Sequence, residues 1–567
     1  MKSFLFFIFF FTICWNTSAQ NFYLKIKGKN NLENKTIDSL IYNTKHKNIK
    51  SLTDEIKAFS LKLTKLGYID NITDDAKLIN DSIYISEFIL GEKIKFLTIN
   101  LDTDSLLASI ISSSIKNNKI QLPYNEIDFF LKETSQKLEK IGYALAKLKL
   151  INIERNQNTL YADLKLETAQ KRNLNTITIR YAEEETTKFP KGHLKQINKK
   201  YQNTIFNQKT VEKINDDFNK FSFVNQVKYP EILFTQDSTT IYVYLEKRKS
   251  NNFDGFLGFS NNENKKITLN GYLDLKLDNI LGSGEELSVY WKSDGNNQKS
   301  FKGSLEIPYL FKSPVGIKTQ LNIFRQDSTF QNTNIAIDLS YFINYGSRIY
   351  IGYHTTESSN IQNLESNLIS DFNNSFITSS FEFTKFNNPN TAFPIKTQIG
   401  TSLALGSREI KNLTNNTTNQ QFIINLNIKH NILLNNKSAI ELKTQNYYMQ
   451  SKRYLANELF RFGGLNSIRG FPENSLNAYY YSTITTEYRY LITPNLYIHS
   501  ILDYSILKNK LEFSNSIYTE NLIGLGAGIG INTKNGLFKI AVANGNNTKN
   551  KFETYNTILH ISYNVKF

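Results

Sequence analysis

The chain has 567 residues, a formal net charge of +16 and 40% hydrophobic residues. It is too long for one ordinary globular core, so two or more domains are expected. Its lysines are isolated along the chain rather than clustered into a basic stripe, which argues against a nucleic-acid-binding protein. A solvated basic surface that favours anionic lipid headgroups is the simpler interpretation.

Residues 1–19 predict a secretory signal peptide. Lys2 supplies the positive start, residues 4–15 form an apolar run, and small residues end at Ala19, after which cleavage is expected. A membrane anchor is the competing interpretation, but it needs about 20 apolar residues. Cys14, the one cysteine, lies inside this segment and does not follow a small residue, as a lipoprotein site requires. The mature chain is therefore expected to have no disulfide, thiolate metal site or thiol nucleophile.

No later segment approaches the length of a spanning helix. The other structure that can cross lipid is a closed β-barrel, because every backbone polar group must be paired inside the hydrocarbon. The 32 tyrosines and 40 phenylalanines fit the aromatic girdles of such a barrel, although sandwich cores could also use them.

Residues 20–249 contain one unit repeated three times, in the modules 20–93, 94–170 and 171–249. Each module has apolar residues at steps of four and three, which form one face of a helix. These residues are Leu52, Ile56, Phe59, Leu63 and Leu66; Ile127, Leu131, Leu138 and Ile141, with Thr134 between them; and Val211, Ile214, Phe218 and Phe221. Gly67 and Gly142 follow the first two helices, where a left-handed residue commonly ends a helix. Ser222 takes this place in the third copy, so that helix must end differently.

Alternating segments flank each helix and predict strands. They are 22–27, 94–101 and 175–180 before the helices, and 82–86, 159–166 and 240–245 after them. Small α/β repeats are a general binding scaffold. An unpaired sheet edge can accept an extended peptide as an extra strand, although such edges could also only pack against neighbouring modules.

From residue 250 to 567 the helical period gives way to alternation with period two. Residues 335–343 are an example, with apolar residues at each odd position. We count sixteen segments: 253–260, 266–277, 285–292, 299–307, 315–326, 333–344, 347–357, 374–386, 395–406, 420–432, 437–449, 477–490, 494–504, 521–533, 536–544 and 555–567. A sandwich would alternate in the same way, but this stretch is long for one. The even count is what single-chain bacterial barrels require.

The two terminal segments of this region have distinct features. The last one alternates strongly and ends with Tyr563, Val565 and Phe567 on one face, as expected of the C-terminal recognition signal of a barrel. The first one carries Gly255 and Gly258, and glycine weakens a strand. The pairing between these two segments is therefore expected to be the weakest seam.

Residues 463–471 read Gly-Gly-Leu-Asn-Ser-Ile-Arg-Gly-Phe. Together with the repeats and the sixteen segments, this motif resembles the outer-membrane barrel-assembly family, of the BamA and TamA type. The resemblance implies α+β periplasmic POTRA modules followed by a 16-stranded antiparallel transmembrane β-barrel. Three modules are closer to the layout of TamA than to that of BamA.

In this family the loop that holds the motif, here about 450–476, folds into the lumen and its arginine contacts acidic residues on nearby strands. The motif residues are Gly463, Gly464, Arg469, Gly470 and Phe471. If Tyr488 and Leu502 face lipid, the alternation turns Glu487 and Asp503 inward, so these two are the candidate partners of Arg469. The alternative is an ordinary external loop.

The expected function is an assembly or translocation factor for outer-membrane proteins, with no nucleic-acid partner. It would capture unfolded clients by strand addition and insert or export them through the seam, in contact with outer-membrane lipid and possible periplasmic or inner-membrane accessory proteins. A two-partner-secretion transporter with a dedicated partner, and a passive porin or adhesin, are the alternatives. The chain has no HExxH, GxSxG or P-loop motif and its six histidines are scattered, so no catalytic residue, metal or cofactor is expected.

Overall fold

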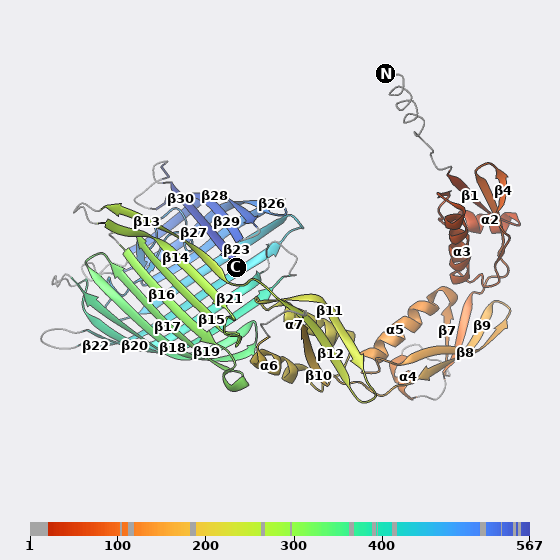
Figure 1. Cartoon of the computed structure of the whole chain (residues 1–567), viewed down its shortest axis with the longest axis horizontal. Helices are drawn as coiled ribbons and strands as arrows, with labels where there is room; N and C mark the ends of the chain where they lie inside the picture. Colours follow the sequence, from red (N-terminus) through yellow and green to blue (C-terminus); the bar gives the residue numbers. More distant parts are fainter. Residues whose placement is uncertain are drawn as a thin grey trace, which may run out of the picture. The chain divides into compact units, whose positions relative to one another are not determined.

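The computed structural model describes residues 21–101, 105–111, 118–181, 189–261, 267–294, 298–361, 368–387, 393, 395–410, 417–510, 518–533, 536–547, 552–553 and 557–566 (Figure 1). The expected signal peptide and Phe567 lie outside these residues. The chain forms two compact units. One runs up to Asn173 and includes Thr204–Gln208, and the other comprises Leu174–Asn203 and the chain from Lys209 onward. No helix among the described residues is long and apolar enough to span a membrane.

The first unit contains two β-sheets, each with helices between its strands. The elements of the first are β1 (Phe22–Gly28), α2 (Asn31–Asp38), β2 (Lys45–His46), α3 (Ile49–Lys65), β3 (Ile72–Thr73), β4 (Lys77–Asn80) and β5 (Ile83–Ile89). The elements of the second are β6 (Phe96–Leu101), α4 (Ser105–Ile111), β7 (Lys119–Pro123), η1 (Tyr124–Glu126), α5 (Ile127–Lys140), β8 (Lys147–Asn156) and β9 (Thr159–Glu167). In both sheets the first long strand pairs in parallel with the strand that follows the helices, β1 with β5 and β6 with β9.

A third sheet of the same kind belongs to the second unit. Its elements are β10 (Thr176–Tyr181), α6 (Lys191–Tyr201), α7 (Gln208–Asn219), β11 (Val224–Phe234) and β12 (Thr239–Lys247). The strand order is β10-β12-β11, with β10 parallel to β12. The N-terminal region therefore has the α+β character expected of POTRA modules.

Each module places the predicted apolar face of its main helix in the core. In α3 the buried side chains are Leu52, Ile56, Phe59 and Leu63, and in α7 they are Val211, Ile214 and Phe218. The first two main helices end at Gly67 and Gly142, both with a φ of 104°. A Cβ on Gly67 would lie 2.2 Å from the carbonyl oxygen of Ile94, so the close approach of the next module also requires glycine here.

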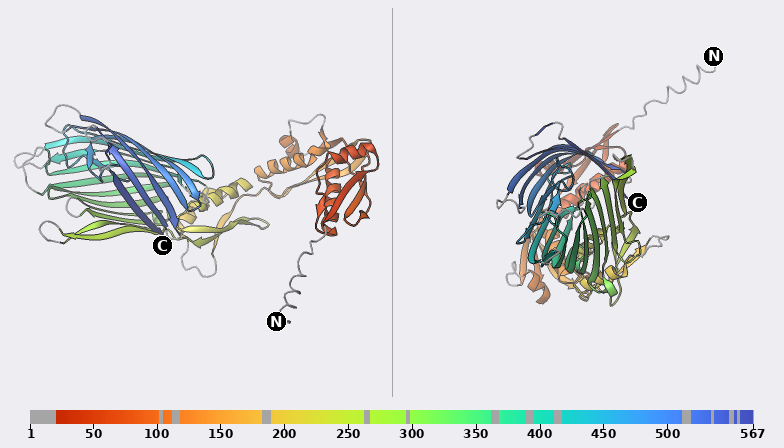
Figure 2. Two further views of the ribbon diagram at one scale, coloured as in Figure 1. Left: turned by 90° about the horizontal axis from the view of Figure 1, so that it is seen from above. Right: turned by 90° about the vertical axis from the view of Figure 1, so that its left-hand side faces the viewer.

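The rest of the second unit is a closed antiparallel barrel of sixteen strands, and this confirms the predicted count (Figure 2). The strands are β13 (Asn252–Asn261), β14 (Ile267–Asp278), β15 (Glu286–Asp294), β16 (Gln298–Ile307), β17 (Val315–Gln326), β18 (Phe330–Asn344), β19 (Ser347–Asn360), β20 (Phe372–Phe386), β21 (Ile395–Ile410), β22 (Thr417–Leu433), β23 (Ser438–Gln450), β26 (Tyr480–Thr493), β27 (Leu496–Asn509), β28 (Tyr518–Thr533), β29 (Gly536–Asn546) and β30 (Ile558–Lys566).

Burial along these strands is reversed relative to a soluble protein. On β18 the side chains of Ile337 and Leu339 are exposed, whereas those of Asp338 and Ser340 are buried. An outward apolar band and a polar interior are the signature of a membrane barrel, because hydrocarbon rather than water contacts the outside. Residues 477–478 do not start a wall strand as predicted. They belong to β25 (Leu476–Ala478), which pairs with β24 (Phe460–Phe462) in a small hairpin.

An aromatic cluster packs the third module onto the barrel. The ring of His193 on α6 lies 4.6 Å from that of Tyr309, in the turn between β16 and β17, and 5.1 Å from that of Phe221. A Cβ on Gly284, in the turn between β14 and β15, would lie 2.3 Å from the Nε2 atom of His193. This interdigitation explains why the third sheet and the barrel form one compact unit.

Candidate functional site

The predicted motif lies in the segment 451–479, between β23 and β26. Three of its glycines have left-handed φ values: 115° at Gly463, 92° at Gly464 and 87° at Gly470. The glycine pair packs against the returning arm of the segment, because a Cβ on Gly463 would lie 2.3 Å from the carbonyl oxygen of Pro472. Only glycine adopts this backbone and tolerates this contact without strain.

This segment lies inside the barrel. Its residues Phe462, Ile468 and Phe471 form one buried apolar cluster with Tyr481 of β26. Tyr480, also on β26, is partly buried and packs against this cluster. The ring of Phe462 is 3.9 Å from that of Tyr481. The exposed apolar side chains of β26 are on its other face, at positions such as Ile484, so the segment covers the inner face and not the lipid-facing one. We call residues 451–479 the lumenal loop.

The structure brings Arg469 together with both of its candidate partners. The Nε atom of Arg469 donates to the Oδ2 atom of Asp503 at 2.8 Å, and its backbone N–H donates to the same oxygen at 2.9 Å. A second guanidinium nitrogen bonds the Oδ1 atom of Asp503, and the third bonds Glu487. The carboxylate of Asp503 is fully buried, so the bidentate pair is shielded from water.

The ion pair is part of a larger network on the inner wall. Arg489 on β26 bonds the Oε2 atom of Glu487 through its Nε atom at 2.8 Å and the Oε1 atom of Glu441 on β23 at 2.7 Å. Lys429 on β22 is 2.8 Å from the other oxygen of Glu441. Glu487, one of the two carboxylates that hold Arg469, is therefore itself fixed by a further cation, Arg489. Arg489 is two residues from Glu487 and so shares its inward parity, but the sequence gave no reason to single out Glu441.

Two glycines let the motif touch the wall backbone directly. A Cβ on Gly470 would lie 2.4 Å from the carbonyl carbon of Asn544 on β29, and one on Gly545 would lie 2.4 Å from the carbonyl oxygen of Gly470. The same hypothetical atom on Gly545 would lie 2.8 Å from the ring of Phe471. Phe471 therefore wedges against β29, with its ring buried.

A second anchor, which the sequence did not reveal, holds the other half of the lumenal loop. Glu458 accepts hydrogen bonds from Arg408 on β21 and, at 2.6 Å, from Gln421 on β22. Arg408 is fully buried and also donates to the carbonyl oxygen of Arg453 at 3.1 Å. The predicted segment 395–406 ended before Arg408, so an inward-facing arginine was counted as loop. Extending the alternation by two residues would have found it.

The predicted seam and terminal residues lie as follows. Gly255 pairs with Leu273 and Gly258 with Asn270, both on β14. Between β13 and β30 the described residues pair at two positions, Asn252 with Lys566 and Phe253 with Val565. By contrast, β13 pairs with β14 at ten positions. Tyr563 pairs through its backbone with Phe538 of β29. None of these residues contacts the Arg469 network through a bond that the structure shows among its described residues.

Comparison with known proteins gives the family. The Omp85 superfamily domain matches residues 279–562, half of the chain. No curated protein sequence matches. The solved structure of CdiB from Acinetobacter baumannii is 15% identical, with a TM-score of 0.50, over 84% of this chain and 90% of that one. BamA from Haemophilus ducreyi lacking POTRA domains 1–3 is also 15% identical, with a TM-score of 0.49, over 83% of this chain and 99% of that one.

These identities bear on the fold alone, and the resemblance to the layout of TamA stays a prediction. The family model spans the barrel from β15 to the first half of β30 and includes the lumenal loop, which carries the sequence motif. The chain belongs to the Omp85 superfamily.

Proposed function

We propose that this protein is an outer-membrane assembly or translocation factor without enzymatic activity. It receives unfolded outer-membrane or secreted proteins by strand addition and inserts or exports them through the seam between β13 and β30. The three modules lie in the periplasm, where accessory proteins can reach them. Members of the superfamily are outer-membrane β-barrel proteins, which supports an insertion or export role.

The short seam is the observation that carries this proposal. Two paired positions join β13 to β30, so most backbone groups on this edge of β13, from Asp254 to Asn261, have no pairing with β30 among the described residues. In lipid an unpaired backbone group is costly, and a client strand that pairs with this edge removes the cost. The seam is thus the place where a client strand adds most easily.

The third module offers a second place for strand addition. In the described part of its sheet, β12 is central, so β10 and β11 each pair on one side. On β11 the side chains of Val227 and Leu233 are exposed. An edge strand with exposed apolar side chains accepts extended peptides through main-chain hydrogen bonds, which do not depend on client sequence. Clients of many sequences can therefore be held beside the barrel.

The lumenal loop holds the barrel in its working shape. Arg469 fixes one half of the loop to β26 and β27, and Glu458 fixes the other half to β21 and β22. The loop thus ties together two parts of the wall that lie several strands apart. We infer that this tie keeps the wall rigid while the seam opens.

A cysteine lock tests the seam. The full mature protein is placed in liposomes, an unfolded barrel client is added from urea, and client folding is followed by its heat-modifiable gel mobility and protease protection. Asn252→Cys with Lys566→Cys joins paired residues across the seam. The matched control is Ser288→Cys with Ser304→Cys, which joins paired residues of β15 and β16. Client folding should stop in the oxidised seam variant, recover with reductant, and continue in the oxidised control.

Three outcomes contradict the proposal. Unchanged client folding with a locked seam excludes lateral insertion. Failure of the unlocked protein to accelerate the folding of any barrel client, with transport of one secreted protein instead, identifies a dedicated exporter. Steady ion conductance without either activity identifies a porin.

A further inference from the structure

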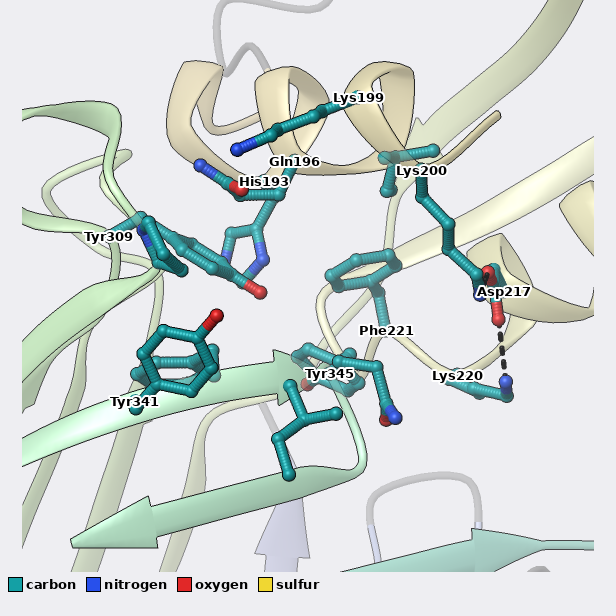
Figure 3. Close-up of a pocket in the computed structure, with 15 residues that line it drawn as sticks. His193, Gln196, Lys199, Lys200, Asp217, Lys220, Phe221, Tyr309, Tyr341 and Tyr345 are labelled. Carbon is teal, nitrogen blue, oxygen red and sulfur yellow. Dashed lines mark hydrogen bonds and ion pairs between the residues drawn. The ribbon is translucent and has the colours of Figure 1, made fainter. Parts of the chain in front are cut away.

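A pocket of about 310 Å³ lies where the third module meets the barrel (Figure 3). Its walls come from α6 and the end of α7 in the module, from the turn that precedes β17, and from the end of β18 with the turn that follows it. The chain enters β13 from the third module, so this end of the barrel carries the turns that join β16 to β17 and β18 to β19. The pocket has no part in the lumenal loop or the seam.

The module side of the pocket is cationic. Lys199, Lys200 and Lys220 line it, together with one carboxylate, Asp217. The Nζ atoms of Lys200 and Lys220 are 2.5 and 2.6 Å from different oxygens of Asp217, which fixes their positions. Burial raises the pKa of Asp217, but hydrogen bonds from these lysines and from Tyr201 outweigh it and hold the pKa below its usual value. Three cations against one anion leave the pocket positive.

The barrel side of the pocket is apolar and continuous with the lipid-facing surface. Tyr341 and Ile343 line the pocket and are 51% and 54% exposed. They belong to the outward face of β18, in register with Ile337 and Leu339. Figure 3 shows the hydroxyl groups of Tyr309 and Tyr341 turned into the same space. A ligand here meets ammonium groups on one side and the hydrocarbon boundary on the other.

Two neighbouring features point to the same kind of ligand. Lys191, Lys195 and Lys199 are exposed and four residues apart, so they form a basic stripe along α6. Beside α6, the turn between β16 and β17 presents Phe311, which is 98% exposed. The side-chain amide of Gln196 donates to the carbonyl oxygen of Lys312 at 2.8 Å and holds this turn against the helix. Basic helix faces and exposed aromatic tips are both features of the membrane interface.

We propose that this pocket binds the headgroup of an anionic phospholipid from the leaflet on the module side of the membrane. The phosphate lies among Lys199, Lys200 and Lys220, and the acyl chains run along Tyr341 and Ile343. A bound lipid would seal the junction between the third module and the barrel at the membrane surface. Lipid binding at this pocket is distinct from the assembly function and can be measured without a client.

Native mass spectrometry of the detergent-purified mature protein tests the site. Phosphatidylglycerol and phosphatidylcholine of the same chain length are titrated separately. The wild-type protein should retain phosphatidylglycerol at a lower lipid concentration than it needs to retain phosphatidylcholine. The double variant Lys199→Gln with Lys200→Gln should bind phosphatidylglycerol on the order of tenfold or more weakly, because each lysine near an anionic lipid surface strengthens binding several-fold. Lys209→Gln with Lys213→Gln on the exposed face of α7 removes the same charge and should leave binding unchanged.

Ile343→Asn should weaken lipid binding without affecting the folded barrel, which is checked by heat-modifiable gel mobility. Soluble glycerol phosphate should bind much more weakly than the lipid. The proposal is overturned if the wild-type protein retains the two phospholipids equally. It is also overturned if the two lysine double variants lose phosphatidylglycerol binding to the same extent. Binding of glycerol phosphate as tight as that of phosphatidylglycerol would assign the pocket to a free phosphate compound instead.

Discussion

Glu441 and Glu487 lie directly opposite each other on β23 and β26, on the inner wall of the barrel. Two carboxylates in this position repel each other unless cations lie between them. Arg489 bonds both, and Arg469 of the lumenal loop bonds Glu487. Lys429 of the wall also pairs with Glu441. Arg469 therefore adds a further cation to Glu487 and joins it to the buried Asp503, which links the position of the loop to the stability of the wall.

Replacement of Arg469 should reveal this link. Arg469→Ala leaves the fully buried Asp503 without a bidentate partner, and breaking a buried pair costs about 3–5 kcal/mol. Client folding in the liposome assay should fall by at least about tenfold, the factor for 1.4 kcal/mol. Arg469→Lys should restore only part of the activity because it lacks the planar fork. The control is Lys452→Ala, which removes an exposed cation of the same loop. Normal activity of Arg469→Ala would show that the buried contacts of Arg469 are not needed for function.

The anchor between Arg408 and Glu458 should behave as a coupled pair. Arg408→Met alone strands the buried carboxylate of Glu458 and should lower the free energy of unfolding by about 3–5 kcal/mol. The double variant Arg408→Met with Glu458→Met removes both charges and should recover much of this loss. The coupling is measured by urea unfolding in detergent, followed by the fluorescence of Trp291, of four proteins: the wild type, Arg408→Met, Glu458→Met and the double variant. If the loss of unfolding free energy in the double variant equals the sum of the losses in the two single variants, the two residues do not act together.

Glycine at position 470 should be essential for the seating of the loop. In Gly470→Ala the new methyl group meets the backbone of Asn544, and the left-handed φ adds strain. We expect faster hydrogen exchange of the lumenal loop and reduced client folding. Gly400→Ala on β21 is a matched control, because a Cβ there meets nothing within 4 Å. Equal effects of the two substitutions would show that glycine is not required by the wall contact.

The junction of the third module should loosen in mild acid. Burial, and then the positive charge of Arg348, lower the pKa of His193 to about 3 from its usual 6.5. The folded state thus binds fewer protons than the unfolded state between these values. The contribution of His193 to stability is complete above pH 6.5 and is lost as pH falls towards 3, by at most about 1.4 kcal/mol per pH unit.

Hydrogen exchange of α6 at pH 7 and pH 5, corrected for the intrinsic rate, measures this effect. Arg348 and the carboxylates of Glu285 and Glu306 line the small cavity next to His193. The proteins compared in this experiment therefore keep these three residues, so that the substitution removes the imidazole alone. His193→Phe keeps an aromatic ring and should remove most of the pH dependence. The same pH dependence in this variant would assign it to other groups.

Much of the fold follows from local patterns. The helical faces around Phe59 and Phe218 and the outward residues of β18 were predicted correctly, because each depends on a period set by the backbone. The inward orientation of Glu487 and Asp503 followed from the same alternation. In a membrane barrel this signal is reliable on each strand, since one face must be apolar to meet hydrocarbon.

The sequence by itself determined how many strands form the wall and which side most of their residues face, although it misplaced the strand boundaries at 477–478 and at Arg408. Tertiary structure alone decided which inward residues meet. Glu441 became the partner of Arg489 through strand register, and Glu458 reached Arg408 through the path of the loop across the lumen. The pairing of β13 with β30, at two positions in the described part of the chain, likewise depends on closing the barrel. Alternation is a local property of one strand, whereas contacts across the lumen depend on how sixteen strands close and where the loop then fits.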